Sequence, residues 1–263
     1  MAPRIVLIRH AQALHNVNKE YDIHDPPLTE LGVEQCALLR QSLRDRFASL
    51  PLEIGEVAII ASPMRRTLQT AQLSLDWLVD RGIKIVANAD WQAVVLLPDI
   101  TDVPLINNIL TQSRSENSDK PCDTGSPISD VSAEFPSVDY GSLDLIYPDK
   151  TSAEATRYAH TRSSILSRGK RGLADLYSRP EKIIFVVSHS GFLRVGVVGW
   201  WFANADYRLF DFVAEKEGDG QFDLTQDETT LAGGLGLSRT SRATLGEDLP
   251  EAGPSKESSG QIV

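Results

Sequence analysis

Near its start the chain reads Ile5-Val6-Leu7-Ile8-Arg9-His10-Ala11-Gln12, in which four branched aliphatic residues stop abruptly at an arginine and a histidine. The apolar run predicts a buried β-strand, and the change at Arg9-His10 places both side chains at its carboxyl end. Open α/β sheets bind ligands at the carboxyl ends of their strands. The stretch is therefore either a solvated strand end or part of a ligand site, and the rest of the chain must distinguish the two.

Two later apolar runs end in the same way. Val57-Ala58-Ile59-Ile60-Ala61 leads into Ser62-Pro63-Met64-Arg65-Arg66-Thr67, and Ile183-Ile184-Phe185-Val186-Val187 leads into Ser188-His189-Ser190-Gly191. We expect an α/β fold, a three-layer α/β/α sandwich with a mostly parallel central sheet, in which the three strand ends share one edge. Two histidines and at least two arginines would then face a common volume, a set that suits a dianionic phosphoryl group.

The segments between these strands have helical signals. Thr29 is a candidate N-cap for a helix over Glu30 to Phe47, and a second helix follows Thr67 through Val79. Ile83 to Val86 is a candidate short strand. A long helix is expected over Ala153 to Tyr177, with its basic residues largely facing solvent: Arg157, Arg162, Arg168, Lys170 and Arg171.

The composition is that of a soluble globular protein, with 41% hydrophobic and 24% charged residues among 263. A formal net charge of -10 argues against broad binding to nucleic acid or to an anionic membrane, but allows a local basic pocket for an anionic substrate. Cys36 and Cys122 stand far apart, which argues against a disulfide framework or a structural zinc site. With no apolar leader before the first strand, we expect a cytoplasmic protein.

The domain organisation predicted is a catalytic domain over residues 1–213 and a tail over 214–263. The tail is rich in Gly, Ser, Thr, Asp and Glu, and we expect it to be disordered at least after residue 233, because it has little apolar surface to offset the entropy of ordering. Residues 93–115 contain two prolines within an apolar stretch and are expected to be an insertion in the catalytic domain.

Taken together and in order, the three strand-end motifs resemble the histidine phosphatase superfamily in its phosphoglycerate-mutase-like branch, and its fungal-type members in particular. Pro27-Leu28-Thr29-Glu30-Leu31-Gly32 is similar to the segment that this family places before its first long helix. The resemblance covers roughly residues 4–213.

The resemblance implies a role for each matching position. His10 would be the nucleophile that takes the phosphoryl group as a phosphohistidine, and His189 would contact the phosphate and stabilise charge in the transition state. Arg9 and Arg66 would clamp the phosphate, with Arg66 preferred over its neighbour because the family's arginine directly precedes the threonine. Asn16 would complete the donor set. No metal and no cofactor is implied.

Other histidines and the tryptophans lack this context. We expect His15, His24 and His160 to be surface or loop residues, and Trp200 and Trp201 to be core or pocket wall.

Two positions depart from the family pattern. Ala11 stands where many members have glycine, and a methyl group there could disturb the loop if the position needs a positive φ. The family's general acid is expected just after Gln92, where this chain has Ala93. Setting aside residues 93–115 makes Glu116 the candidate acid, with Asp119 and Asp123 as alternatives. That insertion is either a lid over the pocket or translated intron sequence, and we favour the second.

The function expected is a metal-independent phosphatase acting on a phosphomonoester or related phosphorylated small molecule. The alternatives are a phosphoglycerate-mutase-type phosphotransfer and a catalytically impaired phosphate-binding module. The sequence leaves the identity of the substrate open, because the insertion and the loop walls determine it and not the shared phosphate site. The oligomeric state is also left open.

Overall fold

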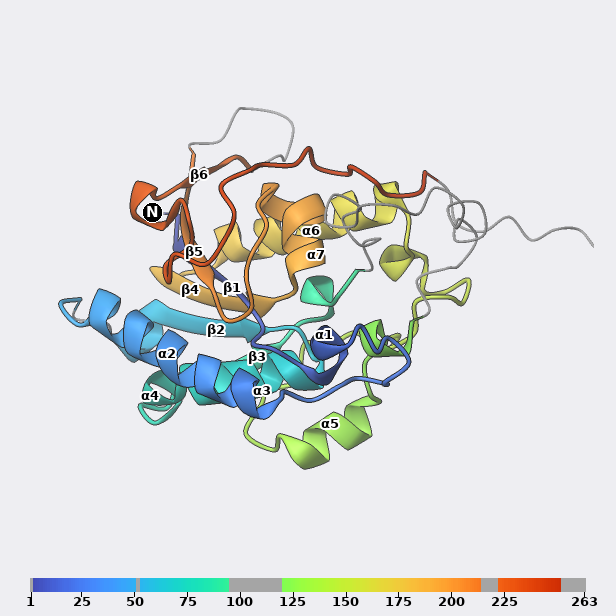
Figure 1. Ribbon diagram of the computed structural model, residues 1–263, viewed down its shortest axis with the longest axis horizontal. Helices are drawn as coiled ribbons and strands as arrows, with labels where there is room; N and C mark the ends of the chain where they lie inside the picture. The colour runs from blue at the N-terminus through green and yellow to red at the C-terminus, as the bar shows by residue number, and fades with distance from the viewer. Residues whose placement is uncertain (1, 51–52, 95–119, 214–221, 252–263) are drawn as a thin grey trace, which may run out of the picture.

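The computed structural model describes residues 2–50, 53–94, 120–213 and 222–251, and within them the strands form a six-stranded sheet of order β3-β2-β4-β1-β5-β6 (Figure 1). The strands are β1 (Arg4–Arg9), β2 (Val57–Ala61), β3 (Ile85–Ala87), β4 (Ile183–Ser188), β5 (Tyr207–Phe212) and β6 (Leu224–Gln226). Neighbours from β3 through β1 pair in parallel, and β5 and β6 are antiparallel. The expected α/β fold with a mostly parallel sheet is confirmed.

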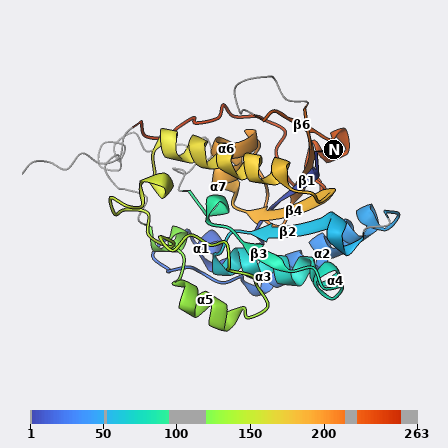
Figure 2. The same ribbon diagram turned by 180° about the vertical axis from the view of Figure 1, so that it is seen from behind.

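Helices cover both faces of this sheet, as the two opposite views show (Figures 1 and 2). They are α1 (Leu14–Val17), α2 (Glu30–Phe47), α3 (Arg65–Ser74), α4 (Asp76–Val79), α5 (Ile128–Glu134), α6 (Arg162–Ser178) and α7 (Ser190–Phe192), which continues as a π-helix over Leu193–Val198. Short 3-10 turns span Ile54–Glu56, Ala89–Trp91, Pro121–Asp123, Thr156–Tyr158 and Glu228–Thr230. No helix in the described ranges has both the length and the apolar character needed to cross a membrane.

Successive residues of β1 belong to two separate cores. Val6 and Ile8 pack with α2, α3 and α4, whereas Ile5 and Leu7 pack with α6 and the segment after α7. A strand that is buried on both faces needs a continuous apolar sequence, which explains the unbroken run before Arg9. The run therefore ends at the edge of the buried layers, where the polar residues begin.

The start of α2 is fixed to the loop that follows His10. The Thr29 hydroxyl accepts a hydrogen bond from the Gly32 amide at 3.0 Å, and the Thr29 amide donates to the Gln12 carbonyl at 3.0 Å. A Cβ on Gly32 would lie only 2.1 Å from that carbonyl oxygen. The close approach requires glycine, and it holds the loop after β1 against the first long helix.

The long helix expected over 153–177 is shorter than predicted. It begins at Arg162 because the Thr161 hydroxyl caps it, accepting from the Ser164 amide at 3.2 Å. The expectation that its basic residues face solvent is wrong for Arg168, which is 1% exposed and lies over the Phe192 ring at 4.3 Å. Arg171 is half-buried and pairs with Asp90 at 2.8 Å.

The predicted disorder after residue 233 is wrong for residues 234–251, which the structure holds against the domain. The buried Asp206 carboxylate accepts hydrogen bonds from the Leu235 and Leu237 amides and from the Ser238 hydroxyl. Gly233, at φ 85°, has no room for a side chain, because a Cβ would lie 1.8 Å from Asp206 Oδ2. Hydrogen bonds to a buried carboxylate therefore hold this polar stretch, together with Leu235, which packs against the first core, and Leu249, which is buried in the second. The proposed division at residue 213 remains a prediction.

Candidate active site

The ends of β1, β2 and β4 meet at one edge of the sheet. The His10 amide donates to the Ser188 carbonyl at 3.0 Å, and the Ser62 amide donates to the Val187 carbonyl at 3.0 Å. The His10 and His189 rings consequently lie 5.1 Å apart, centre to centre. Three polar segments that are distant in sequence are thus brought together, as the pattern of strand ends predicts.

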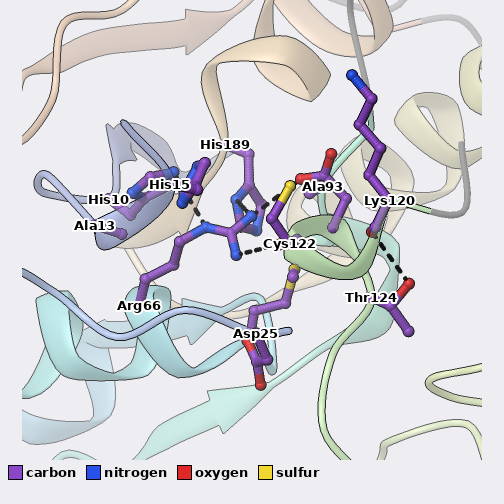
Figure 3. Close-up of polar contacts among 12 residues, drawn as sticks. His10, Ala13, His15, Asp25, Arg66, Ala93, Lys120, Cys122, Thr124 and His189 are labelled. Carbon is purple, nitrogen blue, oxygen red and sulfur yellow. Dashed lines mark hydrogen bonds and ion pairs between the residues drawn. The ribbon is translucent and has the colours of Figure 1, made fainter. Parts of the chain in front are cut away.

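Arg66, in the first turn of α3, lies between the two histidines (Figure 3). It is 1% exposed; its Nε donates to His10 Nε2 at 3.3 Å, and its outer nitrogen Nη2 contacts His189 Nδ1 at 3.2 Å. The same guanidinium donates to the Cys122 carbonyl at 2.7 Å and pairs with Asp123 at 3.2 Å. Arg65 instead pairs with Glu134 at 2.7 Å. The geometry therefore agrees with the preference for Arg66 over Arg65.

His10 is held in one tautomer by its own loop. Its Nδ1 lies 2.7 Å from the Ala11 carbonyl oxygen, which can only accept, so the ring proton is on Nδ1 and the lone pair is on Nε2. Burial lowers the pKa of His10 well below its ordinary value of 6.5, and the charges of Arg66 and Arg9 lower it further. The imidazole is therefore neutral near pH 7, with an unprotonated nitrogen facing Arg66.

His189 takes the opposite tautomer. Its Nδ1 accepts from Arg66, so Nε2 carries the proton and donates to the Ser62 hydroxyl at 2.9 Å. Burial, and then the charge of Arg66, lower the pKa of His189 well below 6.5. Ser62, for which the sequence suggested no role, thus orients the second histidine.

Arg9 is the second cation of the site. Its Nη1 donates to the Phe202 carbonyl at 2.8 Å, its guanidinium lies 5.8 Å from the centre of the Trp201 ring, and its buried Nε has no partner among the described residues. Burial and the charge of Arg66 lower the pKa of Arg9 to about 10, so it stays positively charged at neutral pH. Trp201 lies beside the site as a wall, and Trp200 packs against the second core, as expected.

Ala11 fits its loop without backbone strain. It is fully buried, its amide donates to the Thr70 hydroxyl at 3.0 Å, and it does not belong to the described non-glycine residues with positive φ. Its methyl group packs into the core shared with α2 and α3. The departure from glycine is therefore accommodated at this position.

The expectation that His15 is a surface or loop residue is wrong. It is 8% exposed, and its ring lies 5.8 Å from the His10 ring, beside the site (Figure 3). Asn16 contacts His15 Nε2 through its own Nδ2 at 3.0 Å, and Asn204 donates both to Asn16 and to the His10 carbonyl. In the sequence, the signal for a role of His15 was its position directly before Asn16 and five residues after His10. His24 is exposed, as expected, and His160 is half-buried.

The predicted acid Glu116 and its alternative Asp119 lie outside the described residues, as does the insertion beyond Val94. The other alternative, Asp123, lies in the site and pairs with Arg66.

Lys150, which the sequence did not single out, donates to the backbone carbonyls of Asp123 and Ala93. Burial lowers the pKa of Lys150 to about 7, which brings its titration close to neutral pH.

Among the described residues, no group of three or more His, Cys, Asp or Glu side chains is arranged to hold a metal ion. Cys36 and Cys122 are both buried free thiols, and burial raises the pKa of each to about 12.

Comparison with known proteins places this geometry in a family. Residues 5–92 match the family model described as histidine phosphatase superfamily (branch 1). Phosphoglycerate mutase-like protein 1 of Arabidopsis thaliana is 32% identical over 202 residues, covering 72% of this chain and 68% of its own length. The Phosphoglycerate mutase-like protein of the same plant is 30% identical over 203 residues, with 72% of each chain covered.

Among solved structures, a phosphoserine phosphatase mutant of Entamoeba histolytica in complex with phosphoserine gives a TM-score of 0.47 at 17% identity, covering 86% of this chain and 98% of that one. The fungal-type placement within the family stays a prediction. With a match to this family model over residues 5–92 and phosphoglycerate mutase-like relatives at this level of identity, the chain belongs to the histidine phosphatase superfamily.

Proposed function

We propose that this protein is a phosphatase that hydrolyses a phosphomonoester, or a related phosphorylated small molecule, through a phosphohistidine on His10 and without a metal ion. The observation that supports this most directly is the state of His10. Its Nδ1 proton is committed to the Ala11 carbonyl, and its Nε2 lone pair faces the buried Arg66. A neutral imidazole beside fixed cations is a suitable nucleophile for an anionic phosphoryl group.

The surrounding side chains have separate proposed roles. Arg66 and Arg9 neutralise the phosphoryl oxygens with their positive charges, and the buried Arg9 Nε–H, which has no partner among the described residues, can donate to them. His189, oriented by Ser62, stabilises the charge that develops on those oxygens. Asn16 stays the predicted additional donor.

Two displacements make up the reaction. In the first, His10 Nε2 forms a bond to phosphorus while the bond from phosphorus to the ester oxygen breaks, and the departing oxygen takes a proton from the general acid. In the second, water attacks phosphorus, the nitrogen–phosphorus bond breaks, and the water proton returns to the conjugate base of that acid. Orthophosphate and the alcohol are the products, and the His10 lone pair is restored.

Glu116 is our proposed general acid, and Asp123 is the alternative that contacts Arg66. The two are distinguished by the leaving group, because p-nitrophenolate departs without protonation whereas an alkoxide needs a proton. The variant that lacks the true acid should lose alkyl phosphate turnover while retaining most of its p-nitrophenyl phosphate turnover. Comparing Glu116→Gln with Asp123→Asn on both substrates assigns the role.

The phosphatase proposal is tested with the full chain and its His10→Ala variant. Release of orthophosphate from generic phosphate esters should be abolished in the variant and unaffected by a chelator. Brief incubation with a labelled ester should yield an acid-labile, base-stable phosphoprotein only in the wild type. Equal turnover by His10→Ala would refute the nucleophile, and orthophosphate binding without any turnover by the wild type would favour the impaired binding module.

A phosphoglycerate-mutase-type transfer is the second candidate, because both Arabidopsis relatives are named phosphoglycerate mutase-like proteins. Incubation with phosphoglycerate isomers separates the two activities. Interconversion of isomers without release of orthophosphate would contradict the hydrolytic proposal.

A further inference from the structure

His15 carries a buried donor that the proposed reaction has not used. The residue is 8% exposed, and its Nδ1 is buried with no hydrogen-bond partner among the described residues. A buried polar atom without a partner is rare, because it has lost its water without gaining a protein partner. Its position on α1, with its ring 5.8 Å from the ring of His10, indicates that the missing partner belongs to the site.

Neighbouring contacts determine which nitrogen of His15 carries the proton. Asn16 Oδ1 lies 3.0 Å from the Ala13 amide, and a backbone amide can only donate. That contact fixes the orientation of the Asn16 amide, so its Nδ2 is the atom that faces His15 Nε2 at 3.0 Å. His15 Nε2 therefore accepts, and the ring proton is on Nδ1. The buried, unpartnered atom is thus an N–H donor.

The electrostatic surroundings select the kind of acceptor. Burial lowers the pKa of His15 to about 3, and the charges of Arg66 and Arg9 contribute, so the ring is neutral at physiological pH. The two guanidinium groups favour an anion in their neighbourhood over a cation. A neutral N–H beside them can donate to such an anion without adding to the repulsion between the cations.

We infer that His15 is a phosphate-binding residue, whose Nδ1–H donates to a non-bridging oxygen of the phosphoryl group held by Arg9 and Arg66. Asn16 is then the positioning residue that fixes the tautomer and the orientation of the His15 ring. This inference rests on the proposed function, because it assigns one more donor to the same phosphoryl group. It also gives Asn16 an indirect role, through His15, in addition to its predicted direct one.

Two substitutions separate the donor from the rest of the side chain. In His15→Asn the side-chain amide can place an N–H where Nδ1 was, but the contact of His15 Nε2 with Asn16 is lost. In His15→Gln the amide oxygen can accept from Asn16 as Nε2 did, but the donor at the Nδ1 position is lost. The probe is inorganic orthophosphate, titrated calorimetrically into the full chain near neutral pH, with near-ultraviolet circular dichroism to check that each variant is folded.

The expected result is that His15→Gln binds orthophosphate roughly ten- to a hundredfold more weakly than wild type, the range for a hydrogen bond to a charged group, while His15→Asn stays within about threefold. In wild-type protein with labelled histidine, the Nδ1–H resonance of His15 should move downfield on addition of orthophosphate. Wild-type affinity in folded His15→Gln would overturn the inference, and so would equal weakening in both variants.

Failure of this inference differs from failure of the proposed function. Wild-type protein that releases orthophosphate from esters, together with an unaffected His15→Gln variant, would overturn the role of His15 alone. Wild-type protein that neither binds orthophosphate nor turns over phosphate esters would contradict both.

Discussion

Acid should destabilise this protein steeply, because its site buries neutral histidines. His10, His15 and His189 all have a pKa below the ordinary value of 6.5 in the folded chain, mainly through burial. In the unfolded chain each would titrate near 6.5, so below that pH the unfolded state binds more protons than the folded one. Stability is therefore fully present above about pH 6.5 and is lost as the pH falls toward the folded pKa values.

The loss of stability in acid can be calculated from proton linkage. A histidine that titrates at 6.5 when unfolded and stays neutral when folded loses about 2 kcal/mol of stabilising free energy between about pH 7 and about pH 5. Three such residues give an upper limit of about 6 kcal/mol, which is comparable with the whole stability of an ordinary domain. For His15 the loss continues down to its folded pKa of about 3.

The assay compares wild type with His15→Gln by urea unfolding, followed by tryptophan fluorescence, at several pH values between these limits. Carboxylates contribute equally to both proteins, so the difference in pH dependence isolates the substituted histidine. The variant should lose about 2 kcal/mol less than wild type over that interval. His24→Gln, which removes an exposed histidine, is the matched control. An unchanged pH dependence in both variants would mean that His15 is not buried as a neutral group in the folded protein.

Three further outcomes are expected. Arg66→Lys should lower kcat/KM for a phosphate ester about a hundredfold, the scale of losing a fixed transition-state donor, while Arg65→Lys changes it little; equal effects would contradict the assignment of Arg66. Gly32→Ala should cost about 1–3 kcal/mol in urea unfolding, since its Cβ would meet the Gln12 carbonyl; an unchanged midpoint would show that the loop moves freely. Asp206→Asn should destabilise by about 2–3 kcal/mol and make residues 234–251 more sensitive to limited proteolysis, and unchanged cleavage would refute its anchoring role.

The sheet, and the edge of it that carries His10 and His189, could be predicted because both follow from the local pattern of apolar and polar residues. Unbroken apolar runs before Arg9, Ser62 and Ser188 identify strands that are buried on both faces, and the strand ends bring His10 and His189 together. Thr29 marked the start of α2 at the correct residue, because an N-cap acts through a hydrogen bond within its own turn.

Features that depend on distant partners could not be predicted. Arg168 looks like a solvated helix residue until Phe192 is placed beneath it, and His15 looks like a loop residue until the rings and amides around it are known. Residues 234–251 have the composition of a disordered tail, yet one buried carboxylate on another element orders part of them. In each case the burial or order of the residue depends on a contact with a residue on another element, and local sequence does not identify that partner.

The anchoring of residues 235–238 on Asp206 has a consequence for how the protein would inactivate. Asp206 ends a turn in which Ala205 has a φ of 55° and donates its amide to the His10 carbonyl, and Asn204 donates to the same carbonyl at 3.2 Å. A buried alanine in this left-handed conformation is kept there by the bonds on both sides of it. Release of residues 235–238 would remove hydrogen bonds that hold this turn beside His10, so heating should lower the proposed phosphatase activity before it melts the sheet.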